Sequence, residues 1–309
     1  MVIQESTYTA YRPMLFGLAY RMLGSASDAE DIVQDVFARY MQLDATDIGN
    51  EKAYLAKMTT NRCLNLLQSS KRRRETYVGP WLPEPLPDEA GDGSRSGGGS
   101  YWSDPAERRE NIGYAYLVLL QKLSPLERAI YVLKATLGFE YADLADMLGK
   151  TEASCRKTFS RAQAKIGSET GPASAPLPAV VLDGEREAAC ERFVDAFLSA
   201  ADTGNFKPLL SLLLDEVTLV SDGGGKARAA LNSIVGIERV MAFIEGIAAK
   251  GVFERGLRRV LVNGAPALAQ YQDGRITKMI CVEITKEPEG SRINNIYMVM
   301  NPDKLTRFE

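Results

Sequence analysis

Histidine is missing from the 309-residue sequence. This absence excludes a Ser-His-Asp or Cys-His catalytic site, zinc bound by histidine, and a histidine pH switch. The four cysteines are isolated and form no C-x-x-C pair, so neither a structural zinc site nor a dithiol redox motif is expected. We therefore predict reduced, buried thiols, with no bound metal and no cofactor.

Long hydrophobic runs are also missing. No stretch approaches the roughly 20 apolar residues that a membrane-spanning helix needs, and the first residues lack the basic-then-apolar pattern of a secretory signal. We therefore expect a cytoplasmic protein that does not bind membranes. Hydrophobic residues make up 45% of the chain and charged residues 25%, which is ordinary for globular protein, and the length predicts two or three domains.

Two segments rich in glycine, proline, serine and alanine interrupt the chain and are typical of linkers. They predict a multidomain protein with two all-α domains followed by an α+β domain. The predicted boundaries are 1–78 for the first helical domain, 79–104 for a flexible linker, 105–167 for the second helical domain, 168–184 for a further linker and 185–309 for the third domain.

Charge is unevenly distributed in the first helical block, although the net charge of the chain is only −3. Residues 28–51 carry seven acidic side chains and one basic one, whereas residues 52–74 carry seven basic side chains and no acidic one. A basic stripe of this kind suits the phosphate backbone of a nucleic acid. The alternative is a solvated helix whose basic end is favoured by the helix dipole. Ser27 is expected to cap the helix that carries the acidic run.

The second block has the spacing of a helix-turn-helix. Ser124 is expected to cap an earlier helix; a short amphipathic helix then covers 141–148, Gly149 supplies the turn, and a second helix covers about 152–166. The alternative is a helical hairpin with a cationic surface. We favour DNA binding, because the exposed face of the second helix carries donors that can reach bases and phosphates. These are Arg156, Lys157, Ser160 and Arg161.

The third block predicts helices followed by an antiparallel meander, which together form an α+β cone. Helices are expected at 185–201 and 236–249, and strands near 216–220, 252–262, 266–271, 274–285 and 292–300. A cone can enclose a pocket, and a lone carboxylate beside an apolar wall can act as a base. The candidate acids are Asp215, Asp222 and Glu283, with Tyr271 or Tyr297 as donors. We favour the alternative, a packed regulatory module without chemistry.

A family resemblance is carried by the first helical block. Residues 16–43 closely resemble region 2 of bacterial sigma-70-type factors, through Asp31, Gln34, Asp35 and Phe37. The resemblance implies that these four residues dock on the β′ coiled coil of core RNA polymerase. Residues 53–74 resemble the part of region 2 that melts and reads the −10 element, with Asn61 holding a flipped base. The implied −10 contacts are Lys57, Asn61, Arg62, Asn65, Lys71, Arg72, Arg73 and Arg74.

Residues 123–166 resemble region 4, which reads the −35 element and docks on the β flap. The two-block layout resembles the extracytoplasmic-function group. The strings WLPEP at 81–85, DGGGK at 222–226 and NPDKL at 301–305 together resemble the subgroup with a fused SnoaL-like (nuclear-transport-factor-2-like) domain. This resemblance implies regulatory interdomain contacts by Trp81, Pro83, Asp222, Gly223, Gly224, Gly225, Lys226, Asn301, Pro302, Asp303, Lys304 and Leu305.

The sequence thus predicts a non-enzymatic sigma factor that directs core RNA polymerase to promoter DNA and helps to open it. Its third domain is expected to control this activity in cis, so that a separate anti-sigma factor is not needed. Two alternatives stay open: a one-component helix-turn-helix regulator that senses a ligand in the cone, and a SnoaL-like enzyme tethered to DNA. The motif at 31–37 argues against the first, because a simple repressor has no use for a polymerase-docking helix.

Overall fold

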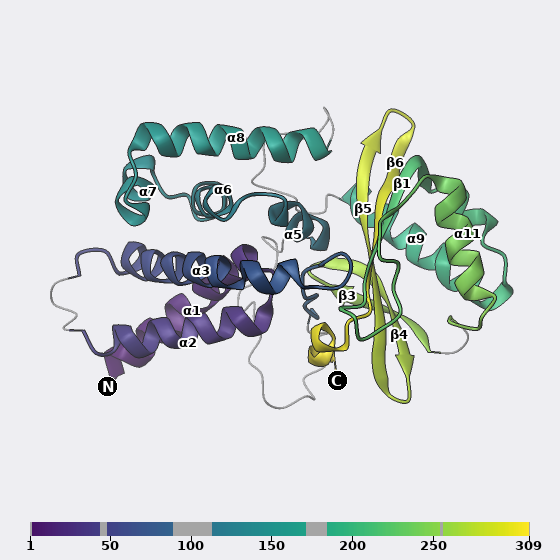
Figure 1. Ribbon diagram of the computed structural model, residues 1–309, viewed down its shortest axis with the longest axis horizontal. Helices are drawn as coiled ribbons and strands as arrows, with labels where there is room; N and C mark the ends of the chain where they lie inside the picture. Colours follow the sequence, from purple (N-terminus) through teal and green to yellow (C-terminus); the bar gives the residue numbers. More distant parts are fainter. Residues whose placement is uncertain (1, 44–47, 89–112, 171–183, 254–255, 309) are drawn as a thin grey trace. The chain divides into compact units, whose positions relative to one another are not determined.

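The computed structural model describes residues 2–43, 48–88, 113–170, 184–253 and 256–308 (Figure 1). Within helical segments, the side chains of residues 2–5, 70–75 and 168–170 are not described. The described residues fall into two compact units. The first contains residues up to 75 together with 117–170, and the second contains 76–88, 113–116 and the chain from 184 onward.

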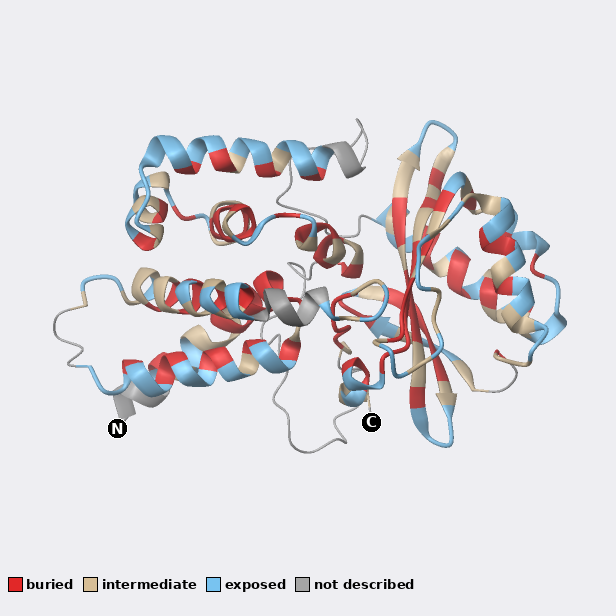
Figure 2. Ribbon diagram, in the orientation of Figure 1, coloured by how far each residue is buried: buried red, intermediate tan, exposed pale blue. Residues whose placement is uncertain are grey.

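The described secondary-structure elements of the first unit are all helices. Its elements are α1 (Val2–Leu23), α2 (Ala26–Tyr40), α3 (Glu51–Glu75), the later part of α5 (Tyr114–Gln121), α6 (Pro125–Tyr131), the short π-helix η2 (Val132–Thr136), α7 (Tyr141–Leu148) and α8 (Glu152–Thr170). Helix α1 packs on α2 and α3, and α6 packs on α8. The buried residues of these helices form stripes, with exposed residues between them (Figure 2). This pattern confirms the amphipathic periodicity.

Helix caps in this unit follow local sequence chemistry. Ser124 caps α6 as expected, and Glu127 completes a capping box with it. Gly149 ends α7 in the left-handed conformation, with φ of 61°, which supplies the predicted turn. The prediction for Ser27 is wrong: α2 begins at Ala26, and Ser25 is its cap, with its Oγ accepting a hydrogen bond from the Asp28 backbone N–H at 3.2 Å.

The second unit combines helices with one six-stranded sheet of order β2-β1-β6-β5-β4-β3. Its elements are α9 (Gly184–Thr203), α10 (Lys207–Leu210), β1 (Leu213–Asp222), β2 (Ile234–Val235), α11 (Ile237–Ala248), β3 (Leu257–Val262), β4 (Ala265–Gln272), β5 (Arg275–Glu287), β6 (Gly290–Val299), and the 3₁₀ turns η3 (Pro302–Lys304) and η4 (Thr306–Phe308). Strands β3 to β6 form the predicted meander. Strand β1 pairs parallel to β6, a pairing that the sequence did not predict.

The main core of the second unit lies between the sheet and helices α9 and α11 (Figure 1). Phe197 is fully buried at its centre, and the ring centroids of Phe193, Phe206 and Phe253 lie 5.7, 5.7 and 5.0 Å from its own. Burial of aromatic surface on this scale dominates the stability of a core. Packed phenylalanines therefore occupy the space between the sheet and these helices, where a ligand-binding cone would have its pocket.

Candidate functional site

The acidic surface of α2 presents the motif expected to bind polymerase. Asp31, Gln34 and Asp35 are exposed along the helix. Phe37 is only 2% exposed, and its ring contacts Tyr8 edge-to-face with centroids 4.7 Å apart. Phe37 therefore packs beneath this surface, while the three polar side chains are exposed on it.

Helix α3 carries the residues expected to contact the −10 element. Lys57, Asn61 and Asn65 recur every four residues and so share one face of the helix. Both asparagines are exposed, and Arg62 forms an ion pair with Asp35 of α2 at 3.6 Å. The cluster from Lys71 to Arg74 falls on side chains outside the described set.

Lys57 is already engaged within the first unit. Its Nζ lies 2.9 Å from a carboxylate oxygen of Asp146 in α7. Nearby, the ammonium group of Lys52 lies 5.4 Å from the centroid of the Phe139 ring. A cavity of about 420 Å³ adjoins the ion pair, lined by Tyr54 and Met147 among others. A residue predicted to bind DNA phosphates is thus paired with an acid from the helix-turn-helix.

The four residues expected to read the −35 element lie exposed on α8. Arg156 forms an ion pair with Glu152 at 3.2 Å, and Arg161 donates a hydrogen bond to the Thr158 hydroxyl at 3.4 Å. The opposite face of the helix is buried through Cys155, Ala162 and Ile166. Donors on one face and core residues on the other give the arrangement that a recognition helix requires.

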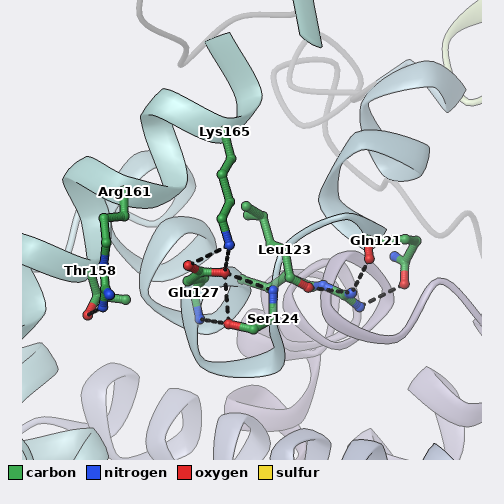
Figure 3. A network of polar contacts seen from close by, with 8 residues as sticks. Gln121, Leu123, Ser124, Glu127, Thr158, Arg161 and Lys165 are labelled. Atoms are coloured by element: carbon green, nitrogen blue, oxygen red, sulfur yellow. Dashed lines mark hydrogen bonds and ion pairs between the residues drawn. The ribbon is translucent and has the colours of Figure 1, made fainter. Parts of the chain in front are cut away.

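A polar network ties the start of α6 to α8 (Figure 3). The Glu127 carboxylate accepts hydrogen bonds from the Ser124 backbone N–H at 3.0 Å and from the Lys165 ammonium at 2.8 Å. Burial by itself would raise the pKa of Glu127, but the Lys165 and Ser124 donors outweigh it and lower the pKa to about 2. This carboxylate therefore ties α8 to the start of α6.

The three short strings WLPEP, DGGGK and NPDKL meet in the second unit, at the end of β1. The Asp222 side chain is fully buried there. Its Oδ2 accepts hydrogen bonds from the Leu82 backbone N–H at 2.9 Å and from the Lys304 Nζ at 2.7 Å. Its Oδ1 accepts from the Tyr77 hydroxyl at 2.6 Å and from the Gly224 backbone N–H at 3.0 Å. One carboxylate therefore joins all three strings.

Lys304 is the cation of this linker-docking site, which we define as Tyr77, Trp81, Leu82, Asp222 and Lys304. Its ammonium group also donates to the Leu82 carbonyl, and it lies 4.2 Å from the centroid of the Trp81 ring and 5.0 Å from that of Tyr77. Two aromatic faces and a carboxylate compensate the loss of water around the ammonium group. The side chain of Lys304 is 11% exposed.

The glycines of DGGGK are required by close packing. Gly224 has a φ of 57°, and a Cβ there would lie 2.3 Å from the Asn301 side-chain nitrogen. At Gly223 a Cβ would lie 2.2 Å from the Ala227 carbonyl oxygen. Asn301 in turn donates a hydrogen bond to the Tyr77 hydroxyl at 2.9 Å. Only glycine lets the loop approach NPDKL this closely.

The remaining members of the strings divide between core and surface. Leu305 is buried, whereas Pro302 is exposed. Lys226 and Asp303 form an exposed ion pair at 2.6 Å. Gly225 has a φ of 72° and lies against Val78.

Several contacts of the linker involve residues that sequence reasoning did not select. The Tyr114 hydroxyl donates to the Pro83 carbonyl at 2.7 Å, and the Leu86 backbone N–H donates to Asn263 Oδ1 at 3.0 Å. Arg307 pairs with the buried Glu84 at 2.9 Å. Asn263 stands in the turn between β3 and β4, and neither this turn residue nor the tyrosines form a sequence pattern that points to the linker. The described part of the predicted first linker, 79–88, is thus packed on the third domain.

The candidate acids of the third block are not brought together. Asp222 belongs to the linker-docking site, and Asp215 is exposed on β1. Glu283 accepts hydrogen bonds from the Tyr297 hydroxyl at 2.6 Å and from the Asn295 side chain at 2.8 Å. The Tyr297 ring lies beside that of Tyr114, with centroids 5.9 Å apart.

Comparisons with known proteins agree with this architecture. The family models for sigma-70 region 2 and sigma-70 region 4 match residues 7–73 and 114–166. The chain is 30% identical to the ECF RNA polymerase sigma factor SigJ of Mycobacterium tuberculosis H37Rv, over 98% of this chain and 94% of that protein. It is 28% identical to the probable ECF RNA polymerase sigma factor SigI of the same species, over 97% and 94%.

The crystal structure of M. tuberculosis SigJ matches this structure with a TM-score of 0.73 at 29% identity, covering 98% of each chain. The chain therefore belongs to the extracytoplasmic-function sigma factors of the sigma-70 family. As a sigma factor it binds core RNA polymerase and promoter DNA. The family is non-enzymatic, which agrees with the predicted lack of catalytic function. Among the described helices, none is both long enough and apolar enough to span a membrane.

Proposed function

We propose that the third domain of this sigma factor controls promoter recognition in cis by holding the linker between region 2 and region 4. The supporting observation is the linker-docking site, where a buried Asp222–Lys304 pair grips the backbone of Leu82 on both its N–H and its carbonyl group. The linker must adapt when the two DNA-binding regions engage polymerase and a promoter. Docking and release of residues 77–88 would then decide whether those regions can engage.

The finer assignments extend this proposal. Asp31, Gln34 and Asp35 bind the β′ coiled coil, with Phe37 supporting them, and region 4 binds the β flap. Exposure of the three polar residues supports the first assignment. The −10 element is bound by α3 and the −35 element by α8. Because the regulator is fused to the chain, no separate anti-sigma factor is required, and the protein acts in the cytoplasm, where polymerase and promoters are.

Promoter-dependent transcription with core polymerase tests this proposal. Lys304→Met removes the buried cation, and Lys226→Met is the matched control, because Lys226 belongs to the same strings but its ion pair is exposed. We expect Lys304→Met to change transcript yield several-fold relative to the parent chain, while Lys226→Met leaves it unchanged. The direction of the change gives the sign of regulation.

Docking itself is measured in parallel through Trp81. In a Trp102→Phe background Trp81 is the remaining tryptophan, and its accessibility to a soluble quencher reports release of the linker. Lys304→Met should raise that accessibility. Equal yields from both lysine variants, in spite of a released Trp81, would refute control through the linker and leave the sigma factor assignment intact.

A further inference from the structure

Two cations lie on one aromatic ring in the helix-turn-helix. The Lys134 Nζ lies 4.9 Å from the centroid of the Tyr141 ring, and the Arg156 Cζ lies 4.5 Å from it. Tyr141 is the first residue of α7, and Arg156 lies in the second turn of α8. The ring therefore connects the two helices of the motif at the end where the recognition helix begins.

The ring and both cations are themselves held in place. Phe159 contacts Tyr141 edge-to-face, with centroids 6.2 Å apart and an interplanar angle of 74°. Glu140 pairs with Lys134 at 3.1 Å, and Glu152 pairs with Arg156 at 3.2 Å. Each carboxylate offsets one positive charge, so that two cations can share a ring without strong mutual repulsion. The Arg156 side chain nevertheless stays 61% exposed.

We propose that Tyr141 is a positioning residue for −35 recognition, whose ring orients the Arg156 guanidinium for contact with a base edge. A guanidinium group that lies over a ring uses its face, while its N–H donors point outward in its plane. The Arg156 Nη2 group donates a hydrogen bond to Glu152 at 3.2 Å, and the remaining N–H donors stay available for a bidentate contact in the major groove. An arginine side chain loses considerable rotamer freedom on binding, and an arginine already oriented loses less.

The inference rests on the proposed assignment of Arg156 to the −35 element. It adds a residue that has no DNA contact of its own and acts through another side chain. Because cation–π contacts at exposed sites are modest, the expected effect on affinity is about 2–5-fold. The loss of affinity caused by changing Tyr141 should depend on the presence of Arg156, whereas a general loss of folding would lower affinity with or without Arg156.

A double-mutant cycle on the full chain, assembled with core polymerase, tests the proposal. The variants are Tyr141→Leu, Tyr141→Phe, Arg156→Ala and the double variant Tyr141→Leu/Arg156→Ala. The measured quantity is holoenzyme affinity for promoter DNA with an intact −35 element, relative to DNA with that element scrambled. Tyr141→Phe keeps the aromatic ring, whereas Tyr141→Leu removes the ring and keeps an apolar side chain. Thermal unfolding of each chain serves as the folding control.

We expect Tyr141→Leu to lose about 2–5-fold of the −35-dependent affinity, Tyr141→Phe to keep it, and Tyr141→Leu to add nothing once Arg156 is alanine. An equal loss in the Arg156→Ala background would overturn the positioning role and leave the −35 assignment standing. An Arg156→Ala chain with full −35-dependent affinity would overturn both. Should Tyr141→Leu unfold, Tyr141→Met takes its place in the same cycle.

Discussion

The linker-docking site and the recognition helix both use a charge pair beside an aromatic ring, in opposite environments. In the first, the Asp222 and Lys304 side chains are 0% and 11% exposed. In the second, the Glu152 and Arg156 side chains are 50% and 61% exposed. A buried pair is expensive to break because the remaining charge is left without water or partner, whereas an exposed pair contributes little. The first arrangement makes release of the linker costly, and the second lets Arg156 exchange its partner at little cost.

The rings differ in the same way. Trp81, which covers Lys304, belongs to the docked linker itself. Tyr141, which orients Arg156, belongs to the scaffold of the helix-turn-helix. Removing the Trp81 ring removes part of the docked linker. Removing the Tyr141 ring changes only the orientation of Arg156. Similar local chemistry therefore holds a segment of the linker in one unit and lies beside an exposed arginine in the other.

The largest expected effect comes from breaking the buried pair. Asp222→Ala leaves Lys304 buried without its carboxylate, and removing one partner of such a pair costs about 3–5 kcal/mol. The free energy of unfolding of the second unit, followed by Trp81 fluorescence in the Trp102→Phe background, measures this cost. Asp303→Ala removes the acid of the exposed pair in the same region and should cost less than about 1 kcal/mol. Similar losses in the two variants would contradict the comparison.

A second prediction concerns the close approach of DGGGK to NPDKL. Gly224→Ala adds a Cβ that would lie 2.3 Å from Asn301 at a residue of positive φ. Gly274→Ala is the control, because Gly274 also has a positive φ, of 80°, but has open space around it. The control should show only the torsional cost of about 1–2 kcal/mol, and Gly224→Ala should exceed it in denaturant unfolding. Equal costs would mean that the loop moves aside freely.

Sequence reasoning succeeded where the signals were local. The helix-turn-helix follows from Gly149 and the apolar spacing of two helices, all within 26 residues of one another in the chain (141–166). The cap on α6 follows from Ser124 in the same way. The prediction of Ser27 as the cap is wrong because Ser25, two residues earlier, offers the same chemistry and accepts the hydrogen bond from the Asp28 backbone N–H.

Contacts between distant segments were harder to predict. Sequence resemblance pointed to the three strings, but Tyr77 and Tyr114 find their partners only in the folded second unit. Strand β2 has two residues and no periodicity to detect. Phe37 fits a partner-binding motif, yet its burial makes it a core residue as well. The pairing of Lys57 with Asp146 depends on packing between helices that no spacing rule encodes.

The Glu127–Lys165 pair is intermediate in exposure between the buried Asp222–Lys304 pair and the exposed Glu152–Arg156 pair. The Glu127 side chain is 10% exposed and that of Lys165 is 53% exposed. With a pKa lowered to about 2, the ionised carboxylate contributes stability above the ordinary glutamate pKa of about 4.3. That contribution should disappear as the pH falls from 4.3 towards 2. Glu127→Gln should cost about 1 kcal/mol of cap stability at neutral pH. Denaturant unfolding of both chains between pH 6 and pH 2.5 should show the difference shrinking.

The smallest expected effect concerns an exposed ion pair, Lys57–Asp146. Asp146→Asn frees Lys57, and the side chains of this pair are 79% and 38% exposed, so stability should change by less than about 1 kcal/mol. Promoter affinity of the holoenzyme should rise by about 2–3-fold at low salt, because Lys57 no longer has to break its ion pair with Asp146 before it binds a DNA phosphate. The gain should fade as salt screens both contacts. Asp215→Asn makes the same charge change on the exposed face of β1 and should leave affinity unaltered. If both variants gained equally, net charge alone would explain the effect, and the Lys57–Asp146 pair would have no part in limiting access of DNA to α3.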